Sequence, residues 1–336
     1  MFLCGNMNWV DWYRGRRIVI TGGLGFIGSN LARRLVELDA RVRIIDAELP
    51  NSGANPHNLE GIAGDVDLWR ADLRDRDVVE AMLVDQEVLF NLAAQSSHLA
   101  SMEDPEIDLT VNAACHLAVV EAARKTRPDI KIVYTATRQA YGRSQTLPVA
   151  EAHAIDPIDY NGISKWAGEM FHLVAHRVYG LNATSLRLTN TYGPRMRCRD
   201  ARLMFLGEWI RRLLCDEPVL IYGAGEQIRD LNYVDDVVTA LLSAAAHPAT
   251  AGRVYNLGTR EPVRLSRLAE VLIATHGGGR IEYVPFPAER ARIDIGDYQG
   301  DFSRIHDELA WSPRVSLCAG LRQTLAFVAD HREHYL

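Results

Sequence analysis

Cysteine is scarce in this sequence, and the few that occur follow neither a metal-binding nor a disulfide pattern. No Cys-x-x-Cys pair is present, and the odd, scattered set consists of Cys4, Cys115, Cys198, Cys215 and Cys318. Such a set is typical of reduced thiols in a cytosolic protein rather than of a disulfide framework or a zinc site. We therefore expect a cytoplasmic protein without disulfides.

Long apolar runs and an excess of positive charge are also missing. No apolar run approaches the ~20 residues that a membrane span needs. The 336 residues carry a formal net charge of -6, which attracts neither nucleic acid nor an anionic membrane surface. We expect no partner of either kind.

The histidines show no metal-binding spacing. Of the eleven histidines, His172 and His176 are four residues apart, which is one turn of a helix, but no nearby carboxylate completes a zinc-binding helix motif. We expect no metal ion.

What the sequence contains instead is an alternation of strand-like and helix-like segments. Short apolar runs rich in β-branched residues indicate buried parallel strands, and they lie at 18–20, 42–46, 88–92, 130–134 and 183–188. Segments with helical apolar spacing lie between them, at 29–38, 111–126 and 164–178. This order predicts an α/β fold of the Rossmann type, with a doubly wound parallel sheet and right-handed crossovers.

The pattern becomes less regular after Pro194. We predict a Rossmann domain over residues 16–190, to which later segments return, and a smaller C-terminal α/β substrate lobe mainly over residues 191–336. Residues 1–15 lack the basic-then-apolar layout of a signal peptide, and we interpret them as a loose leader.

A glycine-rich turn follows the first predicted strand. Its glycines allow a tight turn, close approach of the backbone to a pyrophosphate, and close packing of helix on strand. The helix that begins there presents N–H groups and a positive dipole end to the phosphates. Asp46 ends the second strand, where a carboxylate accepts bonds from the ribose of NAD and repels a 2′-phosphate. The sequence therefore predicts an NAD site that includes Gly22, Gly25, Phe26, Ile27, Gly28 and Asp46.

These residues resemble the extended short-chain dehydrogenase/reductase family, the NAD-dependent nucleotide-sugar epimerases and dehydratases. Further blocks follow in the family's order over nearly the whole chain from Arg16 onward. The resemblance implies that Asp72 and its neighbour Leu73 lie at the adenine. It also implies that the block after Asn91, where histidine is common in the family, lines the nicotinamide side with Leu92, Ala93 and Ala94.

The resemblance also implies where the redox chemistry lies. In the family, a Ser or Thr and a Tyr-x-x-x-Lys pair act on a sugar hydroxyl, and the tyrosine takes the proton while hydride goes to the nicotinamide. Thr137 falls at the hydroxyl position and Lys165 at the lysine, which also binds the nicotinamide ribose. Four residues before Lys165, where the family has tyrosine, this sequence has Asn161.

Asparagine does not titrate near neutral pH and cannot serve as a general base. Three interpretations compete. Tyr160, one residue earlier, could take over, although a one-residue offset turns a helical side chain by ~100°. Another group could take the proton, such as Lys165 or a water held by Thr137 and Asn161. Alternatively, the protein could bind sugar nucleotides without catalysing a reaction.

The two residues after Thr137 distinguish the reactions of the family. Its 4,6-dehydratases place Asp and Glu there as acid and base, whereas this sequence has Arg138 and Gln139, a permanent cation and a neutral amide. This disfavours a dehydratase. An epimerase needs no second carboxylate pair, and Arg138 could instead bind a carboxylate or hydroxyl of the sugar or a nearby acid.

For the substrate, the resemblance places Asn190 and Arg229 at the diphosphate, with Arg290 or Arg292 as a second cation. We expect substrate-binding residues at Gln95, Gln139, Asn190, Arg229 and Arg292. The basic residues Arg195, Arg197 and Arg199 form either a solvated loop or one that faces phosphate.

The preferred hypothesis is an NAD-dependent epimerase, an isomerase, acting on a nucleotide-diphosphate sugar through a transient keto-sugar. A nucleotide-sugar dehydratase or decarboxylase, which is a lyase, and a non-catalytic sugar-nucleotide binding protein are the alternatives. The resemblance also implies a homodimer through two Rossmann helices, near 111–126 and 164–178.

Overall fold

The computed structural model describes residues 9–49, 52–199 and 204–336. Seven parallel strands form one sheet in the order β11-β6-β5-β4-β1-β2-β3. Their bounds are β1 Arg17–Thr21, β2 Arg41–Asp46, β3 Val66–Arg70, β4 Val88–Asn91, β5 Lys131–Thr137, β6 Ala183–Leu188 and β11 Val254–Asn256. The chain winds outward in both directions from β1, so the predicted doubly wound Rossmann sheet is confirmed.

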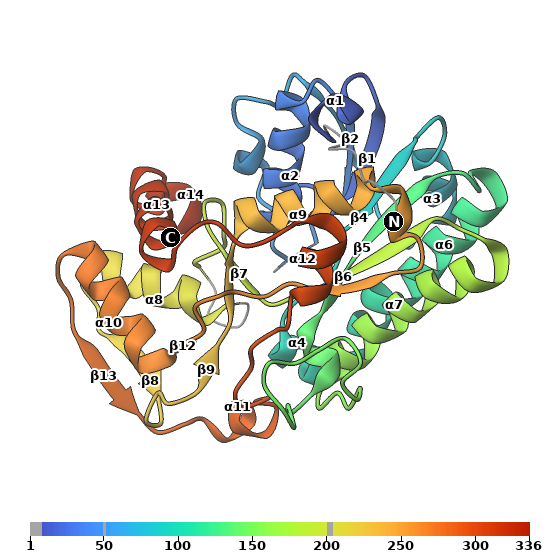
Figure 1. Ribbon diagram of the computed structural model, residues 1–336. Helices are drawn as coiled ribbons and strands as arrows, with labels where there is room; N and C mark the ends of the chain where they lie inside the picture. The colour runs from blue at the N-terminus through green and yellow to red at the C-terminus, as the bar shows by residue number, and fades with distance from the viewer. Residues whose placement is uncertain (1–8, 50–51, 200–203) are drawn as a thin grey trace.

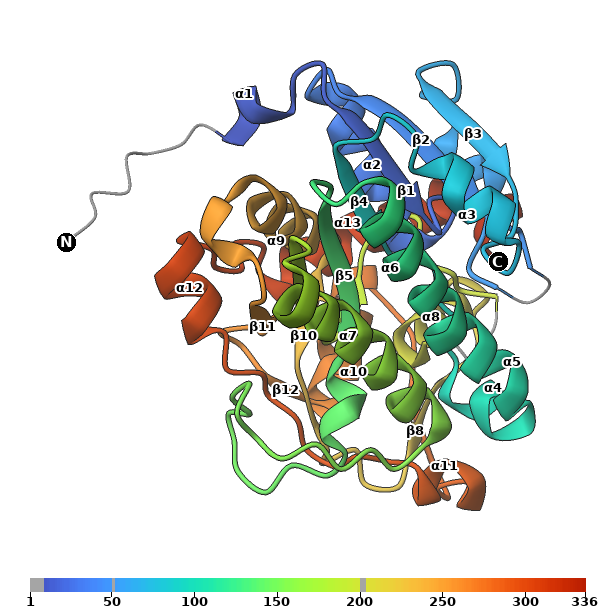
Figure 2. The ribbon, with the colours of Figure 1, turned by 90° about the vertical axis from the view of Figure 1, so that its right-hand side faces the viewer.

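Helices cover both faces of this sheet (Figures 1 and 2). One face carries α2 (Phe26–Glu37) and α9 (Val234–Ala246), and the other carries α3 (Arg76–Met82), α6 (Cys115–Thr126) and α7 (Tyr160–Tyr179). The central strands are largely buried because helices cover parallel strands on both sides, and β4 is buried at every residue. Because these strands are parallel, the carboxyl ends of β1, β2, β4 and β5 lie at one edge of the sheet, where a doubly wound fold binds its ligands.

A second, smaller lobe lies beside the sheet and is built from later segments of the chain. It contains α8 (Phe205–Leu214), α10 (Leu265–His276) and α13 (Leu317–Asp330), with the strand pair β8 (Val219–Tyr222) and β13 (Ile281–Val284). Its own apolar core includes Trp209, Leu268 and Leu321. Two shorter pairs join the lobe to the sheet region: β7 (Asn190–Tyr192) with β10 (Leu231–Tyr233), and β9 (Ile228–Arg229) with β12 (Val263–Arg264).

The remaining elements are short. The helices are α1 (Trp9–Tyr13), α4 (His98–Glu103), α5 (Pro105–Leu109), α11 (Ala288–Arg292), α12 (Ser303–Leu309) and α14 (Arg332–Tyr335). The 3-10 helices are η1 (Pro56–Leu59), η3 (Arg138–Tyr141) and η4 (Pro248–Thr250), and η2 (Thr110–Ala114) is a π-helical turn.

The prediction of a loose leader does not fit residues 9–15. Helix α1 lies there, and Tyr13 is fully buried with its hydroxyl donating to the carbonyl of Leu242, 2.7 Å away in α9. An aromatic ring with a bonded hydroxyl anchors a chain end firmly. Residues 1–8 lie outside the described part.

Within the described residues, no helix is both long enough and apolar enough to cross a membrane. The four cysteines found there, Cys115, Cys198, Cys215 and Cys318, are all free.

Candidate active site

The turn after β1 shows why glycine is required at two of its positions. Gly22 has a φ of +72°, and a Cβ there would lie 2.9 Å from the Cα of Ala93. A Cβ on Gly28 would lie 2.4 Å from the carbonyl oxygen of Gly22. The first turn of α2, which Gly25 caps, thus packs directly on the loop, and its free N–H groups face the edge of the sheet.

Replacing Gly28 by alanine is expected to weaken NAD binding. The added methyl meets backbone rather than a flexible side chain, so the loop and α2 must separate, and we expect a loss of roughly 10- to 100-fold in affinity. Quenching of intrinsic fluorescence by titrated NAD measures this change. Gly64→Ala is the matched control because a Cβ there meets nothing within 4 Å; equal affinity for NAD in both variants would contradict the assignment.

Asp46 stands at the end of β2 with its carboxylate fixed by the backbone. Its two oxygens each accept one N–H bond at 3.0 Å, from Leu24 and Glu48. Burial raises the pKa of Asp46, and these N–H bonds oppose the rise. The carboxylate is therefore held beside the glycine turn, where the adenosine ribose of a dinucleotide lies in this fold.

A cavity of about 360 Å³ runs from this turn along the strand ends. Every residue that the sequence predicts to bind the cofactor lines it: Gly22, Gly25, Phe26, Ile27, Gly28, Asp46, Asp72, Leu73, Leu92, Ala93, Ala94 and Lys165. Thr137, Arg138, Asn161, Gln95, Gln139 and Asn190 line the same cavity. The side chains that the sequence places in separate blocks are thus gathered around one cleft.

Lys165 projects from α7 toward the end of β5. Its Nζ donates to the carbonyl of Thr135 at 2.6 Å, and burial lowers the pKa of the ammonium to about 8 although Asp108 and Glu169 oppose the shift. Thr137, two residues after Thr135, ends β5, and its hydroxyl accepts the N–H of Gln139 at 3.1 Å. A cation and a hydroxyl therefore lie together in the cavity.

Asn161 also lines this cavity, and hydrogen bonds fix its side chain there. Its amide nitrogen donates to the carbonyl of Gln95 at 2.9 Å and to the carboxylate of Asp108 at 3.1 Å, and its backbone N–H reaches Ser101. Asn112, in the π-helical turn η2, donates to the same two acceptors. The side-chain nitrogen of Asn161 is thus a structural hydrogen-bond donor between α7 and the loop and helix that carry Gln95 and Asp108.

Tyr160 lies at the exposed start of α7. Its side chain is 46% exposed, and the residue is not among those lining the cavity. The offset of one position turns it away from Lys165, as helical geometry requires.

A second cavity of about 340 Å³ opens between the sheet edge and the smaller lobe. Arg229 lines it with its guanidinium bonded to Asp294 at 2.8 Å and to the carbonyl of Gly296 at 2.6 Å. Arg290 also lines this cavity, whereas Arg292 is exposed and lines neither of the two. The cavities share His98, Arg138, Gln139, Asn190 and Met204.

Arg138 lies at the junction of the two cavities. One of its terminal nitrogens, Nη2, donates to the amide oxygen of Asn190 at 2.8 Å, and its guanidinium lies 5.1 Å from the ring centre of Tyr298. The other, Nη1, is buried, with no hydrogen-bond partner among the described residues. Burial lowers the pKa of this guanidinium to about 10, with a further contribution from Arg229.

Asn91 directly precedes Leu92, Ala93 and Ala94, which line the cofactor cleft. It is fully buried at the end of β4, where its amide contacts His116 and His172 and accepts from the hydroxyl of Thr21 at 2.8 Å. Burial lowers the pKa of His172 to about 4. Burial therefore keeps His116 and His172 neutral where they contact the amide of Asn91.

The basic stretch after Pro194 binds other parts of the chain. Arg195 donates to Asn30, Arg197 to the carbonyl of Ser52, and Arg199 to the carbonyl of Glu333. All three line a third cavity together with residues 52–56.

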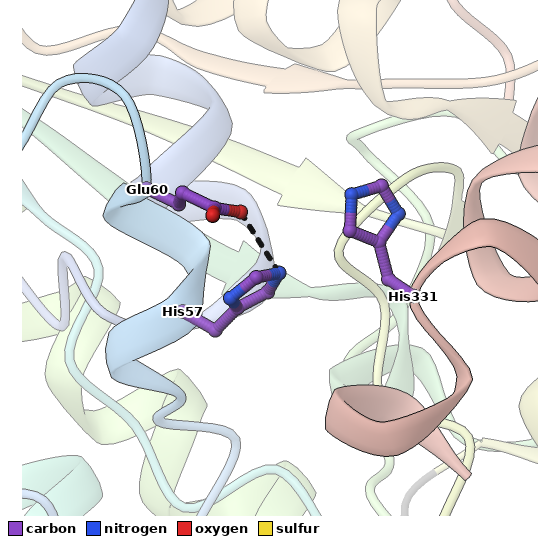
Figure 3. Close-up of side chains that lie close together, drawn as sticks. All are labelled: His57, Glu60 and His331. Atoms are coloured by element: carbon purple, nitrogen blue, oxygen red, sulfur yellow. Dashed lines mark ion pairs between the residues drawn. The ribbon is translucent and has the colours of Figure 1, made fainter.

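Three side chains that could hold a metal ion meet outside the lining of the first two cavities: His57, Glu60 and His331 (Figure 3). The Nε2 of His57 lies 3.2 Å from a carboxylate oxygen of Glu60, and the Nδ1 of His331 contacts the carbonyl of Phe327 at 2.8 Å. The ring of His57 also stacks on His334 at 3.6 Å. An ion pair and ring stacking account for this cluster without a metal, and the absence of a metal stays a prediction.

Sequence reasoning missed His98 and Asp159. His98 is the first residue of α4 and lines both cavities. Its Nδ1 lies 3.0 Å from the carboxylate of Asp159, the residue that caps α7. Asp is favoured at the position before the first residue of a helix, so Asp159 can be recognised from the sequence as a helix cap. No sequence signal connects Asp159 to His98, which lies 61 positions earlier.

Comparison with known proteins identifies a family that matches most of the chain. The family model of the NAD dependent epimerase/dehydratase family matches residues 18–258. A putative UDP-glucose 4-epimerase of Methanocaldococcus jannaschii is 30% identical, over 94% of this chain and 99% of that protein. UDP-glucuronic acid decarboxylase 1 of Arabidopsis thaliana is 29% identical, over 95% of this chain and 71% of that protein. The structure of UDP-glucose 4-epimerase of Thermotoga maritima with UDP-glucose superimposes with a TM-score of 0.86 at 30% identity, covering 94% and 99% of the two chains.

Proposed function

This chain belongs to the NAD dependent epimerase/dehydratase family, and we propose that it is an NAD-dependent epimerase acting on a nucleotide-diphosphate sugar through a transient keto-sugar. One observation carries the proposal. The cleft beside the glycine turn continues into a second cavity lined by arginines, and the two share Arg138, Gln139 and Asn190. A sugar at this junction has a dinucleotide on one side and its own nucleotide diphosphate on the other.

The residues at the cofactor end fit an NAD with its nicotinamide toward Thr137 and Lys165. When bound, NAD supplies the hydride acceptor and returns the hydride to the sugar. The hydroxyl of Thr137 donates a hydrogen bond to the reacting sugar oxygen. The Lys165 ammonium holds the nicotinamide ribose and stabilises negative charge as that oxygen loses its proton.

The residues at the junction favour epimerisation over elimination. Removing water across a carbon–carbon bond needs an acid and a base that can exchange protons. Arg138 and Gln139 provide neither, because a guanidinium stays protonated and an amide does not titrate. Inverting one carbon needs only oxidation, rotation of the keto-sugar and return of the hydride to its other face.

The cations of the second cavity are suited to a diphosphate. Arg229 is oriented by Asp294 and the carbonyl of Gly296, and Arg290 lines the same wall. Guanidinium groups bind phosphate oxygens with two parallel hydrogen bonds. We assign these two arginines and Asn190 to the substrate diphosphate, with Arg290 in place of the predicted Arg292.

Replacing Arg138 by methionine is expected to raise KM more than it lowers kcat. The buried Nη1 has no acceptor among the described residues, and a substrate oxygen would supply one, so its loss should weaken substrate binding by about 10- to 100-fold. Steady-state kinetics measure both constants. Arg322→Met, on the exposed side of α13, is the control; an unchanged KM in Arg138→Met would remove Arg138 from the substrate site.

A homodimer through α6 and α7 is proposed as well. Large apolar side chains are exposed on these helices and at the end of α5: Leu109, Leu117, Ile163, Val174, Val178 and Tyr179. Exposed apolar side chains on two neighbouring helices support an interface there. Sedimentation equilibrium of the purified chain tests it, and a monomer at micromolar concentration would exclude it.

The experiment that tests the function is product analysis by NMR. The purified protein with NAD is incubated with UDP-glucose, UDP-glucuronic acid and UDP-N-acetylglucosamine. Inversion of one sugar carbon supports the proposal. Loss of water or of carbon dioxide instead identifies a lyase, a possibility that the decarboxylase relative supports. Saturable binding without turnover identifies a binding protein.

A further inference from the structure

The proposed function requires a group that takes the proton of the sugar hydroxyl. Asn161 cannot do so, and its amide nitrogen already donates to Gln95 and Asp108. Tyr160 is exposed and does not line the cavity. Lys165 is a donor, bound at 2.6 Å to the carbonyl of Thr135. None of these three side chains offers a base in the cavity, which leaves the other elements that line it.

Helix α4 brings an imidazole to the junction of the two cavities. His98 is its first residue, and it lines the cofactor cleft as well as the second cavity. Its side chain is 37% exposed, whereas the side chain of its partner Asp159 is fully buried. The imidazole thus reaches the cavities while the carboxylate stays inside the protein.

Asp159 is fixed by bonds from two further elements. One oxygen accepts the backbone N–H of Gly162 at 2.7 Å, and the other accepts the amide of Gln139 at 2.7 Å and lies 3.0 Å from the Nδ1 of His98. Burial alone would raise the pKa of Asp159, but His98, Gly162 and Gln139 lower it overall. The Nδ1 of His98 is buried and has no other partner among the described residues, so the carboxylate 3.0 Å away favours the tautomer with its proton on Nδ1 and a lone pair on Nε2.

This arrangement also explains why Gln139 is an amide. A glutamate at that position would place a second carboxylate against the oxygen of Asp159 that Gln139 contacts at 2.7 Å. Two buried like charges at that distance cannot both stay ionised. The neutral donor at position 139 and the carboxylate at position 159 therefore form one unit with His98.

We propose that His98, oriented by Asp159, is the catalytic acid–base residue that replaces the missing tyrosine. During oxidation, the sugar O–H bond breaks and its proton goes to Nε2 of His98, while the C–H bond breaks and its electron pair leaves as hydride to the bound NAD. The carbon and oxygen become a ketone. Reduction reverses both transfers on the opposite face, so His98 and the cofactor end as they began. This inference rests on the proposed function.

The test uses full-length protein loaded with NAD and the UDP-sugar that the wild type converts. His98→Gln is expected to lower kcat by about 10²-fold with little change in KM, because proton transfer in the transition state is lost. His98→Ala should behave alike and recover part of its rate when free imidazole is added, and tetramethylammonium chloride at equal ionic strength should have no effect. His276→Gln is the control, since His276 is exposed in the smaller lobe, lines neither cavity and bonds the carbonyl of Gly278.

Asp159 is a positioning residue in this account. Asp159→Asn should lower kcat by about 10-fold or more, because the amide no longer fixes the tautomer of the imidazole. Added imidazole should not restore its rate, and Asp159→Glu should restore part of it. Circular dichroism and NAD titration of each variant separate this effect from loss of the cap on α7.

The outcomes separate this inference from the proposed function. Wild-type kcat in His98→Gln, or a loss confined to KM, would overturn the role of His98 while epimerisation by the wild type still stood. If Tyr160→Phe instead lost the rate, the exposed tyrosine would be the base. A wild type that converts no UDP-sugar would overturn both.

Discussion

Replacing Lys165 by methionine is expected to lower kcat by about 10³-fold, the largest catalytic effect of any single change outside the glycine turn. The ammonium lies at the end of β5 in the cavity that Thr137 also lines, bound to the carbonyl of Thr135 and 4.8 Å from the ring centre of Tyr134. Methionine keeps the apolar stem and removes the charge, so the fold should persist. Stopped-flow absorbance of NADH and steady-state kinetics measure the loss.

The same side chain predicts how the rate depends on pH. Burial lowers the pKa of Lys165 to about 8, so the ammonium is present below that pH and is lost as the pH rises through it. We expect kcat/KM of the free enzyme to fall on the alkaline side of about pH 8. This alkaline limb should vanish in the residual activity of Lys165→Met. Lys125→Met, at the exposed end of α6, should keep the wild-type rate and profile, and a full rate in Lys165→Met would refute the assignment.

Glu169→Gln is expected to destabilise the protein by about 3 kcal/mol, because it leaves a buried guanidinium without its counter-charge. Glu169 on α7 and Arg187 on β6 have side chains only 1% and 7% exposed, and they meet at 2.5 Å. Burial alone would lower the pKa of Arg187, but Glu169 and Tyr141 raise it. Ser185 and Tyr141 complete the network. Urea unfolding followed by circular dichroism measures the change.

A surface ion pair provides the comparison. Glu37 pairs with Arg34 at 2.7 Å on the exposed side of α2, where solvent screens the charges. Glu37→Gln should leave the midpoint of unfolding nearly unchanged. If the two variants unfolded at the same urea concentration, the buried pair would contribute no more than a surface one.

Much of the cofactor side could be predicted because its signals are local. The glycine turn and Asp46 lie within 25 residues of each other, and each is required by the backbone around it. The strand-like runs were recognisable because strands buried on both faces are continuously apolar. The edge strand β3 was not predicted, since its residues are only half-buried and carry Asp67 and Arg70. The short β11 was missed because three residues give no period.

The acid–base side could not be predicted because its signals are distant in the chain. His98 and Asp159 meet only when α4 packs beside the start of α7. The sequence predicts that Asn161 stands where a base is expected, whereas its bonds to Gln95 and Asp108 are visible only in the structure. Likewise, Arg290 rather than Arg292 lines the second cavity because the two lie on different sides of the short helix α11.

The most direct test of the central claim, reversible oxidation of a sugar nucleotide by bound NAD in this cleft, is isotope retention. A UDP-sugar deuterated at every ring carbon is converted by the protein in ordinary water, and the product is examined by mass spectrometry. The account predicts an epimer that keeps all of its deuterium, because the hydride returns from the same cofactor to the carbon that it left. An epimer that has exchanged deuterium for solvent hydrogen would contradict it.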